Sequence, residues 1–385
     1  MNKCGRTFLT GDWRSSLNAL LSLLRTRENC HQWSAEAPCL SRGQATAAAT
    51  QAPDAEKRKP SQLRAIDLAR KLQQEEPKVQ AAEAPMSSVQ KKVAEFKRFS
   101  LQLQKVHPNV LAKHLSRNVL YQNQHVVLIN KPYNVPLRDS SKDTSISSVL
   151  PVVAKMMDGM KVRCESQLLP CLGLEKEMTG VLLLARSEEA VEHIYELHRS
   201  NQVQRKYWIV TVGVPVPSEG IIDIPIIERE VAGPPSHFKM GLSPVYRMNE
   251  KGTGLTKMRA HRQALPAATK YKVLDSGSGC SLVELQAFTG VKHQLRVHMA
   301  SALACPILGD HKYSHQSKLA PQKLPEGVLG KLGLEQSKVR HVPLHLHARQ
   351  MTLPGSIQVS CPLPKFFIQT LSQLHLTFPK QKDDK

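Results

Sequence analysis

The sequence lacks any pattern of paired cysteines. Its eight cysteines are scattered over 385 residues, and no two of them stand at C-x-x-C spacing. That spacing is typical of zinc knuckles and thiol redox sites, so neither a metal site nor a redox site is expected. The cysteines are also too sparse for a disulfide scaffold, which indicates a reducing compartment.

Long apolar runs are absent as well. No stretch of 18 or more apolar residues occurs, so no membrane insertion is expected. The composition is 41% apolar, which is enough for one large or two modest globular units. No internal repeat is visible, so the chain is not predicted to be a solenoid.

Acidic residues are scarce relative to basic ones. The chain has 53 Lys and Arg against 32 Asp and Glu, a net charge of +21. Residues 107–385 hold 35 basic and 22 acidic residues, a net charge of +13, so the charge is not confined to one tail. This distribution predicts an anionic partner, nucleic acid before a membrane surface or an acidic protein. The alternative is a soluble basic protein with diffuse charge.

The N-terminal segment has the composition of a targeting signal. Residues 1–27 carry five basic residues against one acid, and their leucines recur at helical spacing. An amphipathic, Arg-bearing, acid-poor leader predicts mitochondrial import, to the matrix, with a nuclear or cytoplasmic fraction left open. A secretory signal fits less well because its apolar run is short, and an ordinary amphipathic helix is the other alternative. Residues 1–60 are therefore expected to be a transit peptide and disordered linker.

Residues 61–106 are expected to form a basic helical extension. One helix is predicted from residue 61 to 76 and ends at Pro77. A second begins at the possible capping box Ser87-x-x-Gln90, with Val93 and Phe96 on its apolar side and lysines on the others. Such a helix could dock on a core and offer cations to phosphates. At the other end of the chain, residues 373–385 are expected to be a charged tail.

The region between these ends is rich in strands. Apolar runs at 126–132, 181–185 and 206–213 predict buried strands, and 220–227, 269–275, 281–287 and 344–353 predict further ones. Ser187 can cap a helix that runs through His198. Many strands with few intervening helices predict an α+β fold with a mostly antiparallel sheet.

Two segments near the C-terminal third carry the most specific pattern. Residues 288–298 read FTGVKHQLRVH, and residues 305–313 read CPILGDHKY. Together they resemble the TG-R/K-x-HQ-x-RVH and P-I-x-GD-x-x-Y signature of the RluA-type RNA pseudouridine synthases. Residues 126–132, VVLINKP, are similar to the family's first motif, L-x-V-x-N-K-P. The resemblance covers roughly residues 107–372, which are expected to be the catalytic domain.

This resemblance implies a fold, a partner and a reaction. The fold would be the pseudouridine-synthase fold, a bent mixed sheet with an RNA cleft across its middle. The reaction breaks the C1′–N1 bond of a uridine, turns the detached uracil and forms a C1′–C5 bond. Because no group enters or leaves overall, no cofactor and no metal are expected. The target nucleotide must leave its stack, and a carboxylate held in a fixed orientation must act on it.

The segment that should hold this carboxylate departs from the family pattern. The family's motif is H-R-L-D-x-x-T-S/T-G, and residues 172–180 read LGLEKEMTG. The aspartate position therefore holds Glu175, and the His, Arg and first Thr positions hold Leu172, Gly173 and Met178. A glutamate keeps the charge but moves the carboxylate outward by one methylene. Glu177 matches a position that is Glu in relatives with an intact aspartate, so a supporting role is expected for it.

Other positions of the family pattern are present. Tyr207 matches the tyrosine that stacks on the target uracil, although a core aromatic in a strand would give the same pattern. Arg296 matches the arginine that pairs with the catalytic carboxylate. Gly290 is expected to open a helix whose first turn offers Lys292 and His293 to anions, and Lys176 is a further RNA-binding candidate.

Two functions are consistent with this sequence. The first is a mitochondrial RNA pseudouridine synthase that uses Glu175 on rRNA, tRNA or mRNA. The second is a non-catalytic RNA-binding protein with a synthase fold that acts in mitochondrial ribosome assembly. The retained Tyr207 and Arg296 favour the enzyme, and the four changed motif positions favour impaired chemistry.

Overall fold

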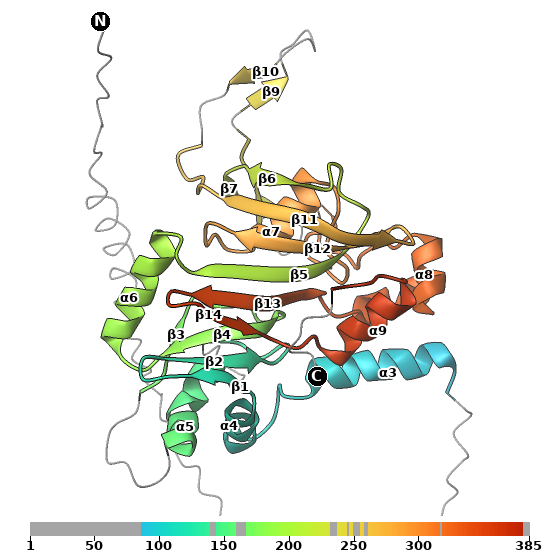
Figure 1. The fold of residues 1–385 in the computed structure, drawn as a ribbon. Coiled ribbons are helices and arrows are strands. Elements are labelled where there is room, and N and C mark those ends of the chain that lie inside the picture. The colour runs from blue at the N-terminus through green and yellow to red at the C-terminus, as the bar shows by residue number, and fades with distance from the viewer. Residues whose placement is uncertain are drawn as a thin grey trace, which may run out of the picture. The chain divides into compact units, whose positions relative to one another are not determined.

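The structure, a computed structural model, describes residues 86–379 apart from 139–143, 159–166, 232–236, 245, 249–254, 258–260 and 316–317. The expected leader, its linker, the helix predicted at 61–76 and the last six residues of the tail lie outside the described residues. The secondary structure of the described part is drawn in Figure 1.

One mixed sheet of ten strands organises the described chain. Its order is β1-β2-β4-β13-β5-β12-β11-β6, with β3 paired to β4 and β14 paired to β13. Only the β4–β13 pair is parallel, so the expectation of an α+β fold with a mostly antiparallel sheet is confirmed. The strands are β1 (Val119–Gln122), β2 (Val126–Lys131), β3 (Leu169–Cys171), β4 (Thr179–Ala185), β5 (Gln204–Val212), β6 (Glu219–Asp223), β11 (Ala268–Gly277), β12 (Cys280–Ala287), β13 (Leu346–Leu353) and β14 (Ile357–Ser360).

The parallel pair at the middle of the sheet requires a glycine. His347 and Ala348 of β13 lie beside Thr179 and Gly180 of β4. Gly180 has φ +112°, and a Cβ there would lie 2.3 Å from the Ala348 carbonyl oxygen. Only glycine accommodates both the conformation and the close approach. Thr179 Oγ1 and His347 Nδ1, 2.8 Å apart, join the strands on one face.

Helices cover both faces of strand β4, which follows the loop that carries Glu175. Helices α4 (Pro108–Arg117) and α5 (Ile146–Asp158) pack on one face, with the side chains of Leu182 and Leu184. Helix α6 (Glu188–Arg199) packs on the other face, with Val181 and Leu183. Because each face is covered, β4 is buried at every position, and residues 181–185 are all apolar instead of alternating. This burial explains the continuous apolar run in its sequence.

Helix α3 (Ser88–Leu101) docks on the core, as its apolar stripe predicts. Its capping box is formed by Ser87 and Gln90, and its buried side chains are Val93 and Phe96. They pack in a cluster with α8 (Glu326–Leu332), the 3₁₀ helix η2 (Gln336–His341) and α9 (Lys365–Gln373). Leu374 and Leu376 are buried in the same cluster, so the packed chain continues past residue 372.

The remaining elements lie outside the ten-stranded sheet. Strands β7 (Ile226–Val231) and β8 (His237–Leu242) form one antiparallel pair, and β9 (Tyr246–Met248) and β10 (Leu255–Lys257) form another. Helix α7 (Gln294–Val297) continues directly into the π-helix η1 (His298–Ala302). Within the described ranges, no helix combines the length and the apolar character needed to cross a membrane.

Candidate active site

The loop before β4 carries Glu175 and is held by a buried lysine. Lys131, at the end of β2, is fully buried and its Nζ donates to the carbonyl oxygens of Pro132 at 3.0 Å, Lys176 at 2.9 Å and Met178 at 2.9 Å. Two of these carbonyls closely follow Glu175 in the chain, so the ammonium group fixes the backbone next to it. Burial lowers the pKa of Lys131 to about 7. Sequence comparison located this lysine in a motif but gave it no role.

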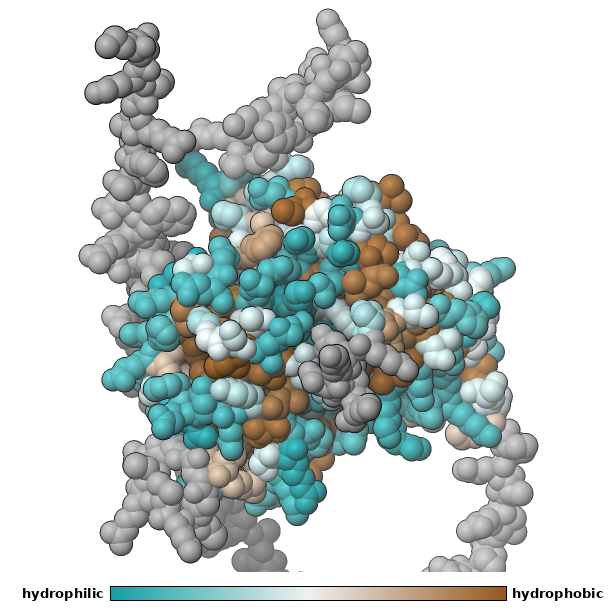
Figure 2. All heavy atoms as spheres, in the orientation of Figure 1, coloured by the Kyte–Doolittle hydropathy of each residue, from teal (hydrophilic) through white to brown (hydrophobic). Residues whose placement is uncertain are grey.

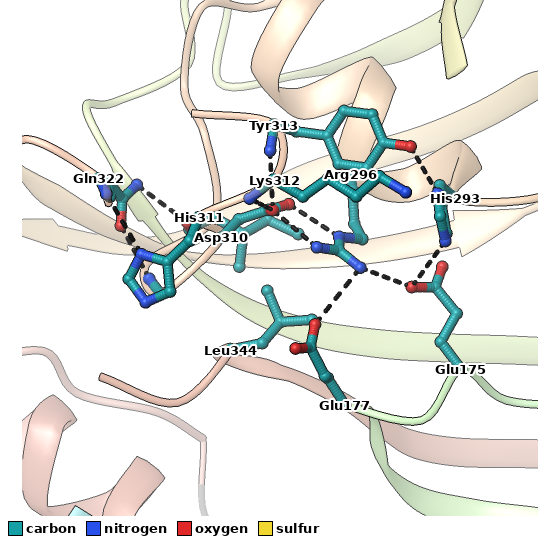
Figure 3. A network of polar contacts seen from close by, with 12 residues as sticks. Glu175, Glu177, His293, Arg296, Asp310, His311, Lys312, Tyr313, Gln322 and Leu344 are labelled. Atoms are coloured by element: carbon teal, nitrogen blue, oxygen red, sulfur yellow. Dashed lines mark hydrogen bonds and ion pairs between the residues drawn. The ribbon is translucent and has the colours of Figure 1, made fainter. Parts of the chain in front are cut away.

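The guanidinium of Arg296 joins Glu175 to the opposite side of the site. Its Nη1 donates to Glu175 Oε2 at 2.8 Å, while Nε and Nη2 donate to the two carboxylate oxygens of Asp310 at 2.8 and 2.7 Å. Glu177 lies further away, 3.7 Å from the same Nη1. Figure 3 shows the arginine between these carboxylates. The predicted pairing of Glu175 with Arg296 is therefore present.

Asp310 is the residue of this network that sequence reasoning missed. It is fully buried, and its Oδ1 also accepts from the backbone N–H groups of Lys312 and Tyr313. The signal was the Gly309-Asp310 dipeptide of the second motif. Gly309 has φ +82°, and a Cβ there would lie 2.0 Å from the Pro343 carbonyl oxygen. The glycine thus permits the close packing that brings Asp310 under Arg296.

The segment expected to open as a helix at Gly290 is a tight loop. Helix α7 begins at Gln294, and His293 before it has φ +57°. The Gln294 side chain holds this loop: Oε1 accepts from Val291 N–H and from the Thr289 hydroxyl, and Nε2 donates to Ala268 O and Thr269 Oγ1. A buried amide with all these bonds satisfied outcompetes early helix formation.

His293 does not act as a cation at neutral pH. Burial, together with the nearby positive charges of Arg296, Lys312 and Lys292, lowers the pKa of its imidazole to about 3. The neutral ring shares a hydrogen bond with the Tyr313 hydroxyl through Nδ1, and its Nε2 lies 3.7 Å from Glu175 Oε2. Any contact of His293 with RNA would therefore be a neutral hydrogen bond.

An open pocket of about 480 Å³ lies against this network. Glu175, Lys292 and His293 line it, and so does Tyr207, which is only 3% exposed and also packs in the core cluster. Three segments distant in the sequence thus bring a carboxylate, an aromatic ring and a cation to one cavity. Arg296 is 4% exposed and lies behind the carboxylate.

The surroundings of the Glu175 carboxyl group shift its pKa. Its side chain is 26% exposed, and burial raises its pKa above the usual range of a glutamate. The Arg296 guanidinium opposes this shift, while Asp310 and Glu177 add to it. A carboxylate with a raised pKa and one strong cationic partner suits a group that exchanges charge during a reaction.

The other candidate residues are placed as follows. Lys292 is exposed and its Nζ lies 3.4 Å from Glu228 Oε1. Lys176 is half-buried beside Glu175, and its carbonyl accepts from Lys131. Of the positions that differ from the family motif, Leu172 is buried with φ +48° and Gly173 is exposed, and both line the pocket.

The histidines of this region do not converge on a metal site. His298 bonds to Thr269 Oγ1 and to the Ile224 carbonyl. Each imidazole of His345 and His347 is likewise held by one hydroxyl and one carbonyl, of Thr370 and Pro343 and of Thr179 and Cys361, respectively. Among the residues that the structure describes, no group of three or more His, Cys, Asp or Glu side chains could hold a metal ion.

Comparisons with known proteins show which family the chain resembles. A sequence profile described as RNA pseudouridylate synthase matches residues 125–301. The chain is 58% identical over 327 residues to "Pseudouridylate synthase RPUSD4, mitochondrial" of Danio rerio, which covers 83% of this chain and 91% of that protein. The Homo sapiens protein of the same name is 48% identical over 328 residues, covering 83% and 86%. A solved structure, "Human RNA Pseudouridylate Synthase Domain Containing 4", matches with a TM-score of 0.63 at 48% identity, covering 71% of this chain and 98% of that one.

Proposed function

Because the chain belongs to the RNA pseudouridylate synthase family, we propose that it isomerises specific uridines of mitochondrial RNA with Glu175 as the reacting carboxylate. One observation carries this proposal. Glu175 Oε2 lies 2.8 Å from Arg296 Nη1 at the wall of a pocket that Tyr207 also lines. A paired carboxylate beside an aromatic ring is what the rearrangement of a flipped uridine needs.

The residues divide the reaction between them. Tyr207 offers a flat surface for the uracil once the nucleotide has left its stack. Glu175 acts on the sugar or on the base while the C1′–N1 bond breaks, and after the base turns and C1′–C5 forms, the C5 proton is lost and N1 regains one. Arg296 keeps the carboxylate ionised and aimed, and Asp310 holds Arg296 in place through two hydrogen bonds.

Three features support a mitochondrial RNA substrate. The relatives compared above carry the word mitochondrial in their names. The leader in residues 1–60 has the composition of a transit peptide, and residues 61–106 and 107–372 are assigned as a basic extension and a catalytic domain. The net charge of +13 on residues 107–385 suits rRNA, tRNA or mRNA as the substrate. Lys176, Lys292 and the neutral His293 are assigned to RNA contact.

A second function is favoured by one specific observation. Four positions of the catalytic motif differ from the family pattern, at Leu172, Gly173, Glu175 and Met178. A chain that binds RNA without isomerising it would serve mitochondrial ribosome assembly.

Mapping of pseudouridine on mitochondrial RNA, with and without the protein, separates the two functions. Loss of defined pseudouridines from cells that lack the chain, and their return on re-expression, supports the enzyme. An unchanged map together with defective ribosome assembly supports the second function. A reporter fused to residues 1–60 tests the address, since diffuse cytosolic fluorescence without shortening would exclude import.

A further inference from the structure

The candidate pocket has a second polar wall, built by the end of α6 and the start of β5. His198 and Arg205 line the same pocket as Glu175. Their Nδ1 and Nε atoms are buried, and neither has a hydrogen-bond partner among the residues that the structure describes. Native proteins satisfy nearly all buried polar atoms, so two unsatisfied ones in one cavity point to a ligand that completes them.

Arg205 is a buried cation without an anion. It is 8% exposed, and its Nη1 donates to the Leu172 carbonyl at 3.3 Å. In the described part of the chain, no carboxylate forms an ion pair with it, whereas Arg296 meets three. A guanidinium removed from water without a counter-charge is unfavourable, and an anion that enters the pocket would relieve it.

The position of Arg205 relates it to the expected base-stacking surface. Arg205 and Tyr207 are two residues apart on β5, so their side chains share a face of the sheet. The guanidinium carbon lies 6.0 Å from the centre of the Tyr207 ring. Lys206, between them, points to the other face and pairs with Glu284 at 3.0 Å. A nucleotide whose base contacts Tyr207 would thus have a cation within reach of its phosphate.

The wall beside Arg205 is open to such a group. Gly173 follows Leu172, whose carbonyl holds the guanidinium, and it is exposed. A Cβ there would lie 2.9 Å from Leu137 Cδ2, so a side chain at this position would crowd the wall. Beside His198, an ideal Cβ on Gly290 would lie 3.9 Å from Nε2, so glycine leaves space next to the imidazole. Burial and the charge of Arg205 lower the pKa of His198, and the neutral ring can donate or accept a hydrogen bond.

We propose that Arg205, assisted by His198, binds the phosphodiester on the 5′ side of the nucleotide whose base stacks on Tyr207. The assignment rests on the proposed function for the identity of the substrate as RNA, but it concerns binding alone. It gives the pocket two ends, a carboxylate end at Glu175 and a phosphate end at Arg205.

The test is a thermodynamic cycle in which one positive charge of the protein and one negative charge of the RNA are removed, separately and together. The probe is a short single-stranded RNA with one uridine flanked by adenines, whose phosphate 5′ to the uridine is either natural or a neutral methylphosphonate. The full-length protein is compared with Arg205→Met, which keeps the length of the stem, and with Arg205→Lys, which keeps the charge. Binding is followed by fluorescence anisotropy, and melting curves confirm that each variant is folded.

The proposal predicts that the two changes are not additive. The methylphosphonate should weaken binding to the wild-type protein roughly tenfold, Arg205→Met should weaken binding of the natural RNA by a similar factor, and the combination should lose little more. Arg205→Lys should retain part of the preference for the natural RNA over the methylphosphonate RNA, which is the discrimination that the test measures. The exposed Arg199→Met, as matched control, should leave the discrimination of the wild type unchanged.

Two results would overturn the proposal. The wild-type protein could bind both RNAs equally, or Arg205→Met could still discriminate between them as the wild type does. Because this assay measures binding alone, it is independent of any assay of pseudouridine formation. A protein that discriminates between the two RNAs here, but forms no pseudouridine in a separate activity assay, would refute the proposed reaction while supporting this binding site.

Discussion

At the scale of single residues, the charge on Glu175 is the most consequential feature. Burial raises its pKa, and the Arg296 guanidinium only partly offsets the shift. A group whose pKa is raised on folding contributes stability at low pH and loses it as pH rises through the folded pKa. Ionised Glu175 therefore lowers the stability of the folded protein at neutral pH.

The variant Glu175→Gln should for this reason melt a few degrees higher than the wild type at pH 7 to 8. The difference should shrink as the pH is lowered and the wild-type carboxyl becomes protonated. Melting curves over a pH series measure it, with Glu192→Gln as matched control, for which little change is expected because this exposed glutamate lies on helix α6. A lower melting temperature of Glu175→Gln at neutral pH would show that the Arg296 pairing outweighs the cost of burial.

Asp310 should matter for stability more than any carboxylate of the pocket wall. It is fully buried and accepts two hydrogen bonds from Arg296 and two from backbone N–H groups. Asp310→Asn leaves the buried guanidinium without its main partner and should lower the free energy of unfolding by about 3–5 kcal/mol.

Urea denaturation at neutral pH measures the effect of Asp310→Asn. The exposed Asp223→Asn is the control and should change the free energy of unfolding by about 0.5 kcal/mol or less. Equal, small effects of the two substitutions would mean that Glu175 alone suffices to hold Arg296.

At the scale of elements, the predictable features are those set by local chemistry and burial. The apolar run at 181–185 lies in strand β4, which has both faces covered. The helix starts at Ser87 and Ser187 are capped as the sequence predicts. The predicted helix start at Gly290 was wrong. The Gln294 side chain makes hydrogen bonds to residues 289 and 268, which no local sequence pattern reveals.

The candidate site was predictable only in part, for the same reason. Glu175 and Arg296 were paired correctly because a family pattern links them, and the distance of 2.8 Å bears out the pairing. The roles of Asp310 and Lys131 were not predicted, because they depend on contacts with residues 14 and 45 positions away in the chain. The side-chain nitrogen atoms of His198 and Arg205 that lack a hydrogen-bond partner can be recognised only from the three-dimensional structure of the pocket.

Helix α3 provides a test of element packing. Phe96 is 4% exposed and packs in the cluster formed with α8 and α9. Phe96→Ala should lower the free energy of unfolding by about 3–5 kcal/mol, because it removes a buried aromatic ring and leaves a cavity. Arg98→Ala, on an exposed position of the same helix, is the matched control. If denaturant curves show that Phe96→Ala is as stable as the control, α3 does not hold the C-terminal helices.

At the scale of the whole molecule, the excess of positive charge should govern RNA affinity. Binding of a mitochondrial rRNA or tRNA transcript should weaken steeply between about 50 and 200 mM salt, because phosphate contacts release counterions. Lys292→Ala should weaken it severalfold and reduce the salt slope by about 1. Lys272→Ala is a matched control, since this exposed lysine also has a surface carboxylate partner, Glu219, at 3.9 Å, but does not line the pocket. Affinity that does not change with salt would contradict RNA recognition through charge.

The length of the Glu175 side chain is expected to affect the rate of the proposed reaction. Its carboxylate stands one methylene further from the backbone than an aspartate, and a misplacement of about 1 Å can cost roughly 100-fold in rate. Glu175→Asp should raise the rate if reach limits it. If the changes at Leu172 and Gly173 limit it instead, only the triple variant with Leu172→His and Gly173→Arg should do so. Histidine tolerates the φ of +48° at position 172 better than leucine.

Release of tritium from mitochondrial RNA labelled at C5 of uridine measures the reaction of Glu175 most directly. The wild-type protein should release tritium, and Glu175→Gln should release none while it binds the RNA with unchanged affinity. Gln keeps the size and the hydrogen bonding of the side chain but removes the negative charge. Release from Glu175→Gln at the wild-type rate would contradict the assignment of this carboxylate as the reacting group.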